Sequence, residues 1–348
     1  KACTVKLRNL AGKSVLTLEG FTPEERDLYA RAFAAAGAVQ CGFCIPGMVI
    51  SAKALLDQNP DPSRAEVKEA IKGNICRCTG YAKIETAIML AAAVKRGEKF
   101  LPDQPALGRL GQPAPRPDAY IKAAGTAKYA DDYALPGMIY GVALRPPYAR
   151  ATVNRIDIAA AKALPGVVAV LTAADIPGEY KIGHLRHDYP VMIPEGRNVH
   201  FLGDAIALVA AESEAIARAA LELIQVDYTP LPPVLTVADA SREEDRPLVH
   251  QEGNLLSQER LVRGDVDEAL AKADFVVTNT YELPLGEHAF LEPECALGWM
   301  DGDVVNVLCG DQGIYQTKKE LVLMLGLPPE KVRVRAAEAI GGGFGGKE

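Results

Sequence analysis

The sequence predicts an α+β protein built from several domains. Its 348 residues are enough for two or three domains of ordinary size. Segments with helical periodicity fill most of residues 21–98, whereas short β-rich runs alternate with alanine-rich helices beyond a proline-rich stretch at 99–117. We therefore expect a small helical domain first, then an extended linker, then α/β domains.

The helical domain is expected to contain four helices. The first covers 24–37 and ends on a glycine, which suits a left-handed helix terminus. The second covers 46–57 and has proline in its first turn. Ser63 precedes the third, and Glu66 three residues later completes a capping box. The fourth runs from about 83 to 95.

The region from Tyr120 onward is expected to alternate strands with helices. Apolar and β-branched runs predict strands, and alanine-rich runs predict helices. The expected strands are 139–144, 167–171, 205–210 and 224–228, and the expected helices are 158–164 and 212–223. A third segment begins near Ala273 with the apolar run 275–281, and continues with strands at 304–308 and 332–335 around a helix at 315–326.

Two tight pairs of cysteines constrain the function most. Two residues separate Cys41 from Cys44, one separates Cys76 from Cys78, and the pairs lie 32 positions apart, counted from Cys44 to Cys76. Four thiolates brought together bind a soft metal centre, either zinc or an iron–sulfur cluster. A one-residue gap is unusual for zinc, so the spacing favours a [2Fe–2S] cluster, while zinc, disulfides and inert thiols remain alternatives.

Composition excludes several classes of partner. The net charge of −7 and the lack of a long basic run argue against a nucleic-acid partner. The apolar stretches are too short and interrupted to predict a membrane span. Because the sequence starts without Met and stops inside a glycine-rich loop, we expect it to be part of a longer polypeptide.

The final loop matches two phosphate-binding patterns in part. Gly341, Gly343 and Gly346 have the spacing of a dinucleotide fingerprint, but the acidic residue needed about twenty positions later is not in the sequence. The same loop matches a P-loop as far as Lys347, but Glu348 stands where Ser or Thr should bind Mg²⁺. A backbone surface for some other cofactor and a purely structural turn are the further alternatives.

Several single residues have both functional and structural interpretations. Gln312 follows a predicted strand, where it could donate to a cofactor oxygen or serve as a surface or capping residue. His288 is more typical of a partly buried structural histidine than of a ligand. Cys295 and Cys309 are expected to be small buried residues.

These motifs resemble one known family, the molybdenum hydroxylases, which includes xanthine dehydrogenase and aldehyde oxidoreductase. Residues 40–52 and 73–81 resemble its helical [2Fe–2S] domain. Three segments, 118–132, 136–141 and 165–177, resemble its α/β hammerhead domain. Residues 291–294, Gln312 and 341–348 resemble the start of its molybdopterin-binding domain, so the resemblance covers essentially the whole chain.

The resemblance implies domain boundaries and cofactors. The implied parts are the end of a ferredoxin-like [2Fe–2S] domain at 1–20, the helical [2Fe–2S] domain at 21–98, a linker at 99–117, the hammerhead domain at 118–235 and the start of the molybdopterin-binding domain at 236–348. Two [2Fe–2S] clusters and a molybdenum–molybdopterin centre are then expected in the full-length protein. The two cysteine pairs would ligate one cluster, and Cys3 would be the last ligand of the other.

The resemblance also implies roles for individual residues. Gln40 would lie beside the pterin, Gln312 would approach the molybdenum oxo group, Gly343, Phe344 and Gly345 would line the metal centre, and Glu348 would bind substrate. The glutamate that acts as the family's catalytic base lies beyond this sequence.

The implied activity is oxidative hydroxylation of a purine-like N-heterocycle, with electrons leaving through the two clusters. No flavin domain lies between the helical and hammerhead domains, an order typical of flavin-free aldehyde oxidoreductases or of enzymes with FAD on a separate subunit. Glu348, by contrast, stands where xanthine dehydrogenases carry a substrate-binding glutamate. We favour the heterocycle because pocket chemistry sets specificity and domain order does not.

Other interpretations remain at this point. A flavin-free aldehyde oxidoreductase is the alternative within the family. A non-catalytic electron-transfer protein or a zinc-stabilised scaffold is the alternative of another class. We further expect a cytoplasmic homodimer that acts on a small molecule, either a heterocycle or an aldehyde.

Overall fold

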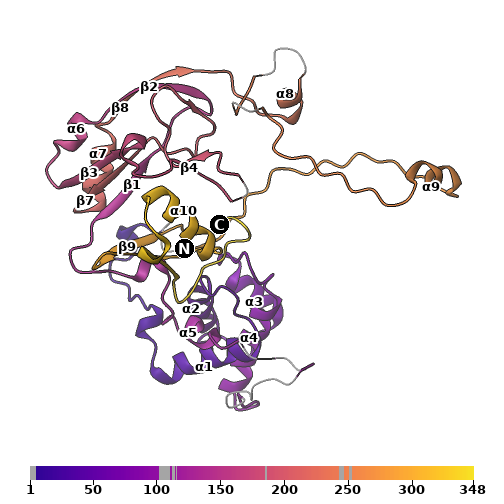
Figure 1. Ribbon diagram of the computed structural model, residues 1–348. Helices are drawn as coiled ribbons and strands as arrows, with labels where there is room; N and C mark the ends of the chain where they lie inside the picture. The colour runs from indigo at the N-terminus through magenta and orange to yellow at the C-terminus, as the bar shows by residue number, and fades with distance from the viewer. Residues whose placement is uncertain are drawn as a thin grey trace. The chain divides into compact units, whose positions relative to one another are not determined.

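The chain divides into two compact units, which we describe separately. The computed structural model describes residues 5–101, 110–111, 114, 116–184, 186–242, 247–250 and 253–348 (Figure 1). The first unit comprises Lys1–Leu135, His288–Val322 and Leu327–Glu348, and the second comprises Pro136–Glu287 and Leu323–Gly326. Cys3 and most of the predicted linker at 99–117 lie outside the described residues.

The four predicted helices of the N-terminal region are confirmed. They are α1 (Pro23–Ala35), α2 (Ile45–Leu56), α3 (Arg64–Ile71) and α4 (Ala82–Lys95). Thr22 with Glu25, and Ser63 with Glu66, form the capping boxes that begin α1 and α3. Gly37 takes a φ of +64° just after α1, a conformation that favours glycine.

These helices share one hydrophobic core with a fifth, α5 (Ala119–Ala123). Phe33, Met48 and Ile88 are fully buried in this core, and each such side chain contributes roughly 1.5–3 kcal/mol through burial. The resemblance assigned residues 118–132 to the hammerhead domain. In the structure α5 packs against the helical core, and its Lys122 contacts the loop that carries Cys41.

The remainder of the first unit contains a three-stranded sheet in the order β11–β10–β9. Its strands are β9 (Ala296–Asp301), β10 (Val304–Cys309) and β11 (Val332–Ala336). The helix α10 (Ile314–Leu325) begins in this unit, and its residues from Leu323 onward belong to the second. β10 is antiparallel to β9 and parallel to β11, with Cys309 paired to Ala336 at the carboxyl ends. Because the chain leaves both parallel strands at the same edge, Gln312 and the glycine loop start close together.

The described residues of the second unit form three small antiparallel sheets. Their strand orders are β1–β7–β3, β6–β2–β8 and β4–β5. The strands are β1 (Tyr140–Leu144), β2 (Ala151–Asp157), β3 (Val167–Thr172), β4 (Lys181–Ile182), β5 (Tyr189–Pro190), β6 (Asn198–Val199), β7 (Ala207–Ala211) and β8 (Gln225–Pro230). Its helices are α6 (Ala159–Lys162), α7 (Glu214–Leu221), α8 (Val237–Ser241) and α9 (Val266–Lys272). α7 packs against β1 and β7, and Val209 and Ala217 are fully buried between them.

The predicted α+β multidomain fold is confirmed, with differences in detail. The expected strands and helices of 139–228 are present within a few residues, but β2 was not predicted. The apolar run 275–281 forms no strand, and Phe275 and Val277 in it are exposed. Figure 1 shows α9 in an extended arm of the second unit, away from the sheets of that unit.

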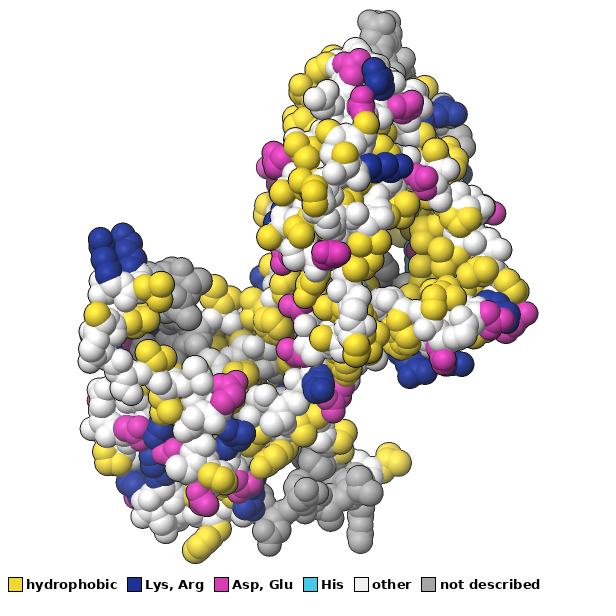
Figure 2. Space-filling model, turned by 90° about the vertical axis from the view of Figure 1, so that its left-hand side faces the viewer, with side chains coloured by type: hydrophobic (Ala, Val, Ile, Leu, Met, Phe, Trp, Pro, Cys, Tyr) yellow, Lys and Arg dark blue, Asp and Glu magenta, His cyan; other side chains and the backbone are white. Residues whose placement is uncertain are grey.

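Charged side chains of both signs share the surface of the described residues. Figure 2 shows basic and acidic side chains interspersed, with no broad basic patch among the described residues on that face. No helix in the described part of the chain is long and apolar enough to cross a membrane.

Candidate iron–sulfur and cofactor site

The four predicted cysteine ligands come together in two pairs. Cys41 and Cys44 lie in the loop that begins α2, and Cys76 and Cys78 lie in the loop between α3 and α4. The side chain of Cys41 hydrogen-bonds with Cys78, and that of Cys44 hydrogen-bonds with Cys76. Each pair thus takes one thiol from each loop.

The two pairs match the donor set of a two-iron cluster. A [2Fe–2S] cluster takes four thiolates, two for each of its two irons, and the two loops supply four thiols in two pairs. A zinc centre, which takes four ligands tetrahedrally around one ion, is the alternative for the same thiols.

The thiols of Cys41, Cys44 and Cys76 differ in the direction of their pKa shifts. A hydrogen bond from Cys44 lowers the pKa of the Cys76 thiol to about 5, with further help from Thr79. The same hydrogen bond raises the pKa of the Cys44 thiol, and burial is the second largest cause of that increase. Burial is the main cause that raises the pKa of Cys41. The Thr79 N–H lies 3.4 Å from the Cys76 sulfur, as expected for a cluster whose sulfurs accept backbone hydrogen bonds.

Two polar side chains beyond the linker hold the first cysteine loop. The Tyr129 hydroxyl donates to the carbonyl oxygen of Cys41 at 2.9 Å. The Lys122 ammonium, only 3% exposed, donates to the Gln40 carbonyl at 3.4 Å and pairs with Asp118 at 2.7 Å. Residues that follow the linker therefore fix the loop that carries Cys41.

The second cysteine loop is fixed by Tyr81. Its hydroxyl accepts a hydrogen bond from the Cys76 N–H at 2.9 Å and lies 3.2 Å from the Asn74 carbonyl, to which it donates. Asn74 in turn accepts a bond from Ser51 of α2 at 2.8 Å. Because Tyr81 begins α4 with a φ of +70°, these contacts hold a backbone conformation that is unfavourable for tyrosine.

A buried ion pair organises the glycine loop. Glu292 is 1% exposed and Lys347 is 5% exposed, with Oε2 and Nζ 2.9 Å apart. The same carboxylate accepts from the Gly341 N–H at 2.6 Å and from the Ala130 N–H at 3.3 Å. A Cβ on Gly341 would lie 2.1 Å from the Glu292 Cβ, so only glycine fits there.

Gln312 also contacts the glycine loop. Its Oε1 accepts the Gly345 N–H at 2.9 Å, and its backbone N–H donates to the Lys347 carbonyl at 2.7 Å. A Cβ on Gly343 would lie 2.0 Å from this Oε1, which explains the glycine. The amide oxygen is engaged, so the NH₂ group of Gln312 is the part left to donate to a ligand.

The loop also presents backbone to open space. Phe344 takes a φ of +56° and is about half exposed. A Cβ on Gly345 would meet no atom within 4 Å. Bare backbone beside an amide donor fits a cofactor with several oxygen and sulfur atoms, such as molybdopterin, because these atoms accept hydrogen bonds.

A cavity of about 320 Å³ adjoins the loop, and Glu348 lines it. The other lining residues come from the start of β9, the end of β10 and the loop itself: Glu294, Cys295, Ala296, Cys309, Gly310, Asp311 and Lys347. Asp311 is already engaged with Gly313 and Thr317 at the start of α10. Among the residues that the structure describes, the Glu348 carboxyl group has no hydrogen-bond partner.

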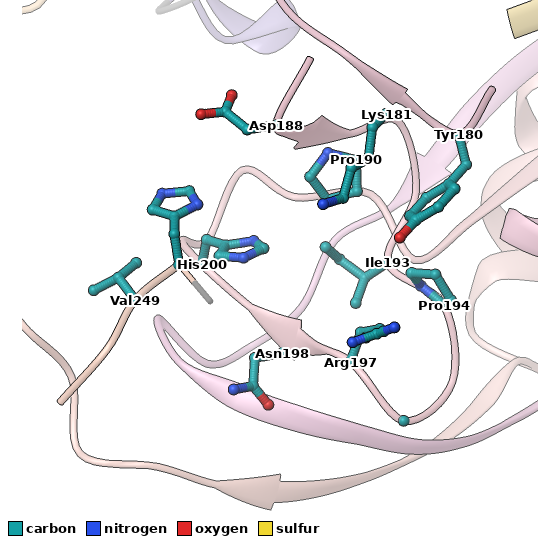
Figure 3. A pocket seen from close by; sticks show the side chains of 12 residues that line it. Tyr180, Lys181, Asp188, Pro190, Ile193, Pro194, Arg197, Asn198, His200 and Val249 are labelled. Carbon is teal, nitrogen blue, oxygen red and sulfur yellow. The ribbon is translucent and has the colours of Figure 1, made fainter. Parts of the chain in front are cut away.

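A second cavity, of about 140 Å³, lies in the other unit and involves none of the predicted site residues. Figure 3 shows Tyr180, Lys181 and Arg197 extending into it and Asp188 pointing away. His200 stacks on His250 at its edge, with ring centroids 5.0 Å apart.

Comparisons with known proteins agree with this arrangement. Residues 17–89 match the [2Fe-2S] binding domain. Residues 124–232 match the a/b hammerhead domain of aldehyde oxidase and xanthine dehydrogenase. Residues 248–348 match the molybdopterin cofactor-binding domain.

Individual relatives match over different parts of the chain. The aldehyde oxidoreductase of Megalodesulfovibrio gigas is 34% identical over all of this chain and 40% of its own length. The nicotinate dehydrogenase large molybdopterin subunit of Eubacterium barkeri is 36% identical over 68% of this chain and 55% of its own. A solved structure of aldehyde oxidoreductase from Desulfovibrio gigas superposes with a TM-score of 0.89 at 33% identity, covering 99% of this chain and 40% of that one.

The fold and the site define a protein that binds a [2Fe–2S] cluster and a molybdopterin cofactor. The chain belongs to the molybdenum hydroxylase family, among whose members are aldehyde oxidoreductase and xanthine dehydrogenase. It spans about 40% of the length of the aldehyde oxidoreductase that it matches throughout.

The predicted site residues form two groups in the structure. The structure brings together the two cysteine pairs, and separately Gln312, Gly343 and Gly345. The side chain of Gln40 is exposed, and its backbone carbonyl bonds to Lys122. Ligation by Cys3 stays a prediction, because that residue lies outside the described part of the chain.

Sequence reasoning did not assign roles to Glu292, Lys347, Tyr129 and Lys122. Glu292 and Lys347 are 55 positions apart, so neither residue indicates the other in the sequence. The one available indication was an acidic residue in an otherwise apolar stretch before a proline, at Glu292.

Proposed function

We propose that this chain ligates one electron-transfer cluster, contributes Cys3 to a second, and forms part of the substrate pocket of a molybdenum hydroxylase that oxidises a purine-like N-heterocycle. The observation that carries the proposal is Glu348, whose free carboxyl group lines the cavity beside the glycine loop. A carboxyl group can accept from, or donate to, the ring nitrogens of a heterocycle. An aldehyde offers no such nitrogen.

Each group on this chain has a defined task in the proposed reaction. When bound, the molybdenum centre supplies the hydroxylation chemistry, and the cluster carries electrons away. Glu348 orients the heterocycle through its ring nitrogens. The NH₂ group of Gln312 donates to a cofactor oxygen, and the Glu292–Lys347 pair keeps the loop in place.

Some relatives support a heterocycle by their names. The nicotinate dehydrogenase subunit of Eubacterium barkeri and a quinoline 2-oxidoreductase from Pseudomonas putida 86 are both named for N-heterocycles. The Pseudomonas structure is 27% identical, with a TM-score of 0.57 over 67% of this chain.

A flavin-free aldehyde oxidoreductase is the second candidate, and one observation favours it. The two aldehyde oxidoreductase structures align with 99% and 98% of this chain, whereas the quinoline enzyme aligns with 67%. The shared order of cluster domain, hammerhead domain and molybdopterin domain on one chain supports this candidate. We infer further that the full-length protein is a cytoplasmic homodimer and that electrons leave to a separate FAD subunit or another acceptor.

The test compares two substrate classes in the full-length holoenzyme. Loss of a buried hydrogen bond to a charged group costs roughly 1.5–3 kcal/mol, which corresponds to roughly ten- to a hundredfold in rate. Glu348→Ala should therefore lower kcat/KM for a purine by that factor and leave simple aldehydes nearly unchanged. Glu330→Ala, which removes an exposed carboxylate elsewhere in the same unit, is the matched control.

Two outcomes would count against the heterocycle. An equal loss for purines and aldehydes would mean that Glu348 supports the loop. Rapid oxidation of aldehydes by the unaltered enzyme, with no turnover of any N-heterocycle, would favour the second candidate.

A further inference from the structure

One short segment, 288–292, joins the second cysteine loop to the glycine loop. Arg77 lies between the predicted cluster ligands Cys76 and Cys78. Its Nε donates to the backbone carbonyl of His288 at 2.9 Å, a contact between residues 211 positions apart. The loop that carries two cluster ligands is therefore tied directly to this segment.

The other side of the segment packs against the glycine loop. A Cβ on Gly346 would lie 2.8 Å from the His288 ring and 3.0 Å from the Phe290 ring, so the bare backbone rests on both rings. The Lys347 ammonium lies 4.6 Å from the centroid of the Phe290 ring, a cation–π distance. Arg77 and the glycine loop thus both contact His288, Arg77 through its backbone carbonyl and the loop through its ring.

The segment contains a strained backbone. Ala289 takes a φ of +54°, in the left-handed region that is unfavourable for a non-glycine residue. Such a conformation persists when surrounding contacts hold it, and it is found often at functional sites. Here His288, which accepts the bond from Arg77, lies directly before Ala289 in the sequence. Phe290, which packs against the glycine loop, lies directly after it.

We propose that Arg77 is a positioning residue for electron transfer between the cluster and the molybdopterin centre. Its hydrogen bond to His288 fixes the cluster loop relative to the glycine loop. Its charge favours the reduced cluster, which carries one more electron than the oxidised one. The inference rests on the cofactor assignment within the proposed function, but not on the substrate.

Two substitutions separate the charge from the tether. Arg77→Met removes both the charge and the donor. Arg77→Lys keeps the charge but lacks the Nε donor and the planar guanidinium, so it should not reproduce the bond to His288. Arg64→Met is the matched control, because Arg64 is a surface arginine of the same unit, 3.8 Å from Glu85.

The experiment uses the full-length holoprotein reduced chemically, without substrate. An EPR-monitored redox titration gives the reduction equilibrium of the cluster, and the magnetic splitting of the Mo(V) signal reports its coupling to the reduced cluster. Arg77→Met should disfavour reduction by roughly threefold to tenfold, where tenfold corresponds to about 59 mV for a one-electron couple, and should change the splitting. Arg77→Lys should change the splitting while nearly preserving the equilibrium, and Arg64→Met should change neither.

Wild-type reduction equilibrium and splitting in Arg77→Met, with full iron content, would overturn the proposal. If Arg77→Met loses its cluster, the Arg77→Lys variant tests the proposal instead. An altered splitting of the Mo(V) signal in that variant would support the role of the hydrogen bond to His288, and a wild-type splitting would overturn it. Failure of the proposed substrate assignment would look different, because turnover would be absent while the EPR signals of the unaltered protein stayed intact. Purified protein with iron but without molybdenum would contradict the cofactor assignment itself.

Discussion

The carboxylate of Glu292 and the ammonium of Lys347 form an ion pair that is almost completely buried, with Oε2 and Nζ 2.9 Å apart. The pair connects the segment before β9 to the end of the glycine loop. Its carboxylate also accepts two backbone N–H groups, from Gly341 and Ala130. A buried charge is tolerated only with such partners, so the pair makes loop geometry depend on both residues.

Glu292→Ala should therefore destabilise the first unit strongly. Removal of one partner leaves the Lys347 ammonium buried and uncompensated, which costs roughly 3–5 kcal/mol. The expected result is a lower midpoint in chemical denaturation and faster hydrogen exchange at the amides of 341–347. Glu214→Ala, which breaks an exposed pair with Arg218, should cost less than about 1 kcal/mol. Equal effects of the two substitutions would contradict this interpretation of the buried pair.

Cys76→Ser should remove or grossly alter the cluster of the helical domain. Its thiol has the lowered pKa of about 5, and hydrogen bonds from Cys44 and Thr79 favour its anionic form. Serine is a poor ligand to iron. We therefore expect the iron content to fall below the value of about two irons that an intact cluster gives, and the EPR signal to change. Cys309→Ser, at a thiol in β10, should retain full iron. Stoichiometric zinc without iron in anaerobically purified protein would refute the cluster assignment.

Asp204 should make the second unit sensitive to acid. Burial raises the pKa of its carboxyl group, but the His200 side chain and the N–H groups of His200 and Phe201 outweigh burial and lower the pKa. Because the folded pKa lies below the unfolded value of about 3.9, its stabilisation is complete above that value and is lost as pH falls through the folded pKa. Asp204→Asn should remove this acid dependence and cost roughly 1–3 kcal/mol near neutral pH.

Amide hydrogen exchange at His200 and Phe201, followed as a function of pH, measures the effect of Asp204. In the unaltered protein, protection should decrease on acidification below about pH 4. In Asp204→Asn, protection should be low throughout. Asp267→Asn, at an exposed carboxylate in α9, should behave as the unaltered protein, and a loss of protection in both variants would argue against a specific role for Asp204.

The sequence predicted features that depend on neighbouring residues better than those that depend on distant ones. The capping box of Ser63 with Glu66 spans three residues, and α3 begins where it indicated. β2 was not predicted because its residues 151–157 mix Thr, Asn, Arg and Asp with few apolar ones, and pairing with β8 rather than local pattern forms it. The run 275–281 has a β-like composition, but composition alone supplies no partner strand.

The sequence predicted those site residues that belong to family motifs. It did not predict the residues that reach the site through contacts between distant parts of the chain. The paired cysteine spacing indicated the ligands, because thiolate chemistry limits the alternatives. The bond between Arg77 and His288 joins residues 211 positions apart, and the support of Cys41 by Tyr129 joins residues 88 apart. No local pattern encodes such contacts.

The contact between Tyr129 and Cys41 leads to the last prediction. The Tyr129 hydroxyl donates to the Cys41 carbonyl at 2.9 Å, and its ring packs edge-on against Phe43 at 5.1 Å. Burial raises the pKa of this phenol, so it remains a neutral donor at physiological pH. Tyr129→Phe keeps the ring and removes the donor, which leaves the Cys41 carbonyl unsatisfied at a cost of roughly 1–3 kcal/mol.

Tyr129→Phe should therefore loosen the cluster without abolishing it. The expected result is normal iron content, faster cluster loss to a chelator and faster exchange at the amides of 40–44. Tyr133→Phe is the control, because the Tyr133 hydroxyl accepts only a long contact from the Glu338 N–H at 3.4 Å. A cluster as stable in Tyr129→Phe as in the unaltered protein would mean that the hydrogen bond from Tyr129 does not support it.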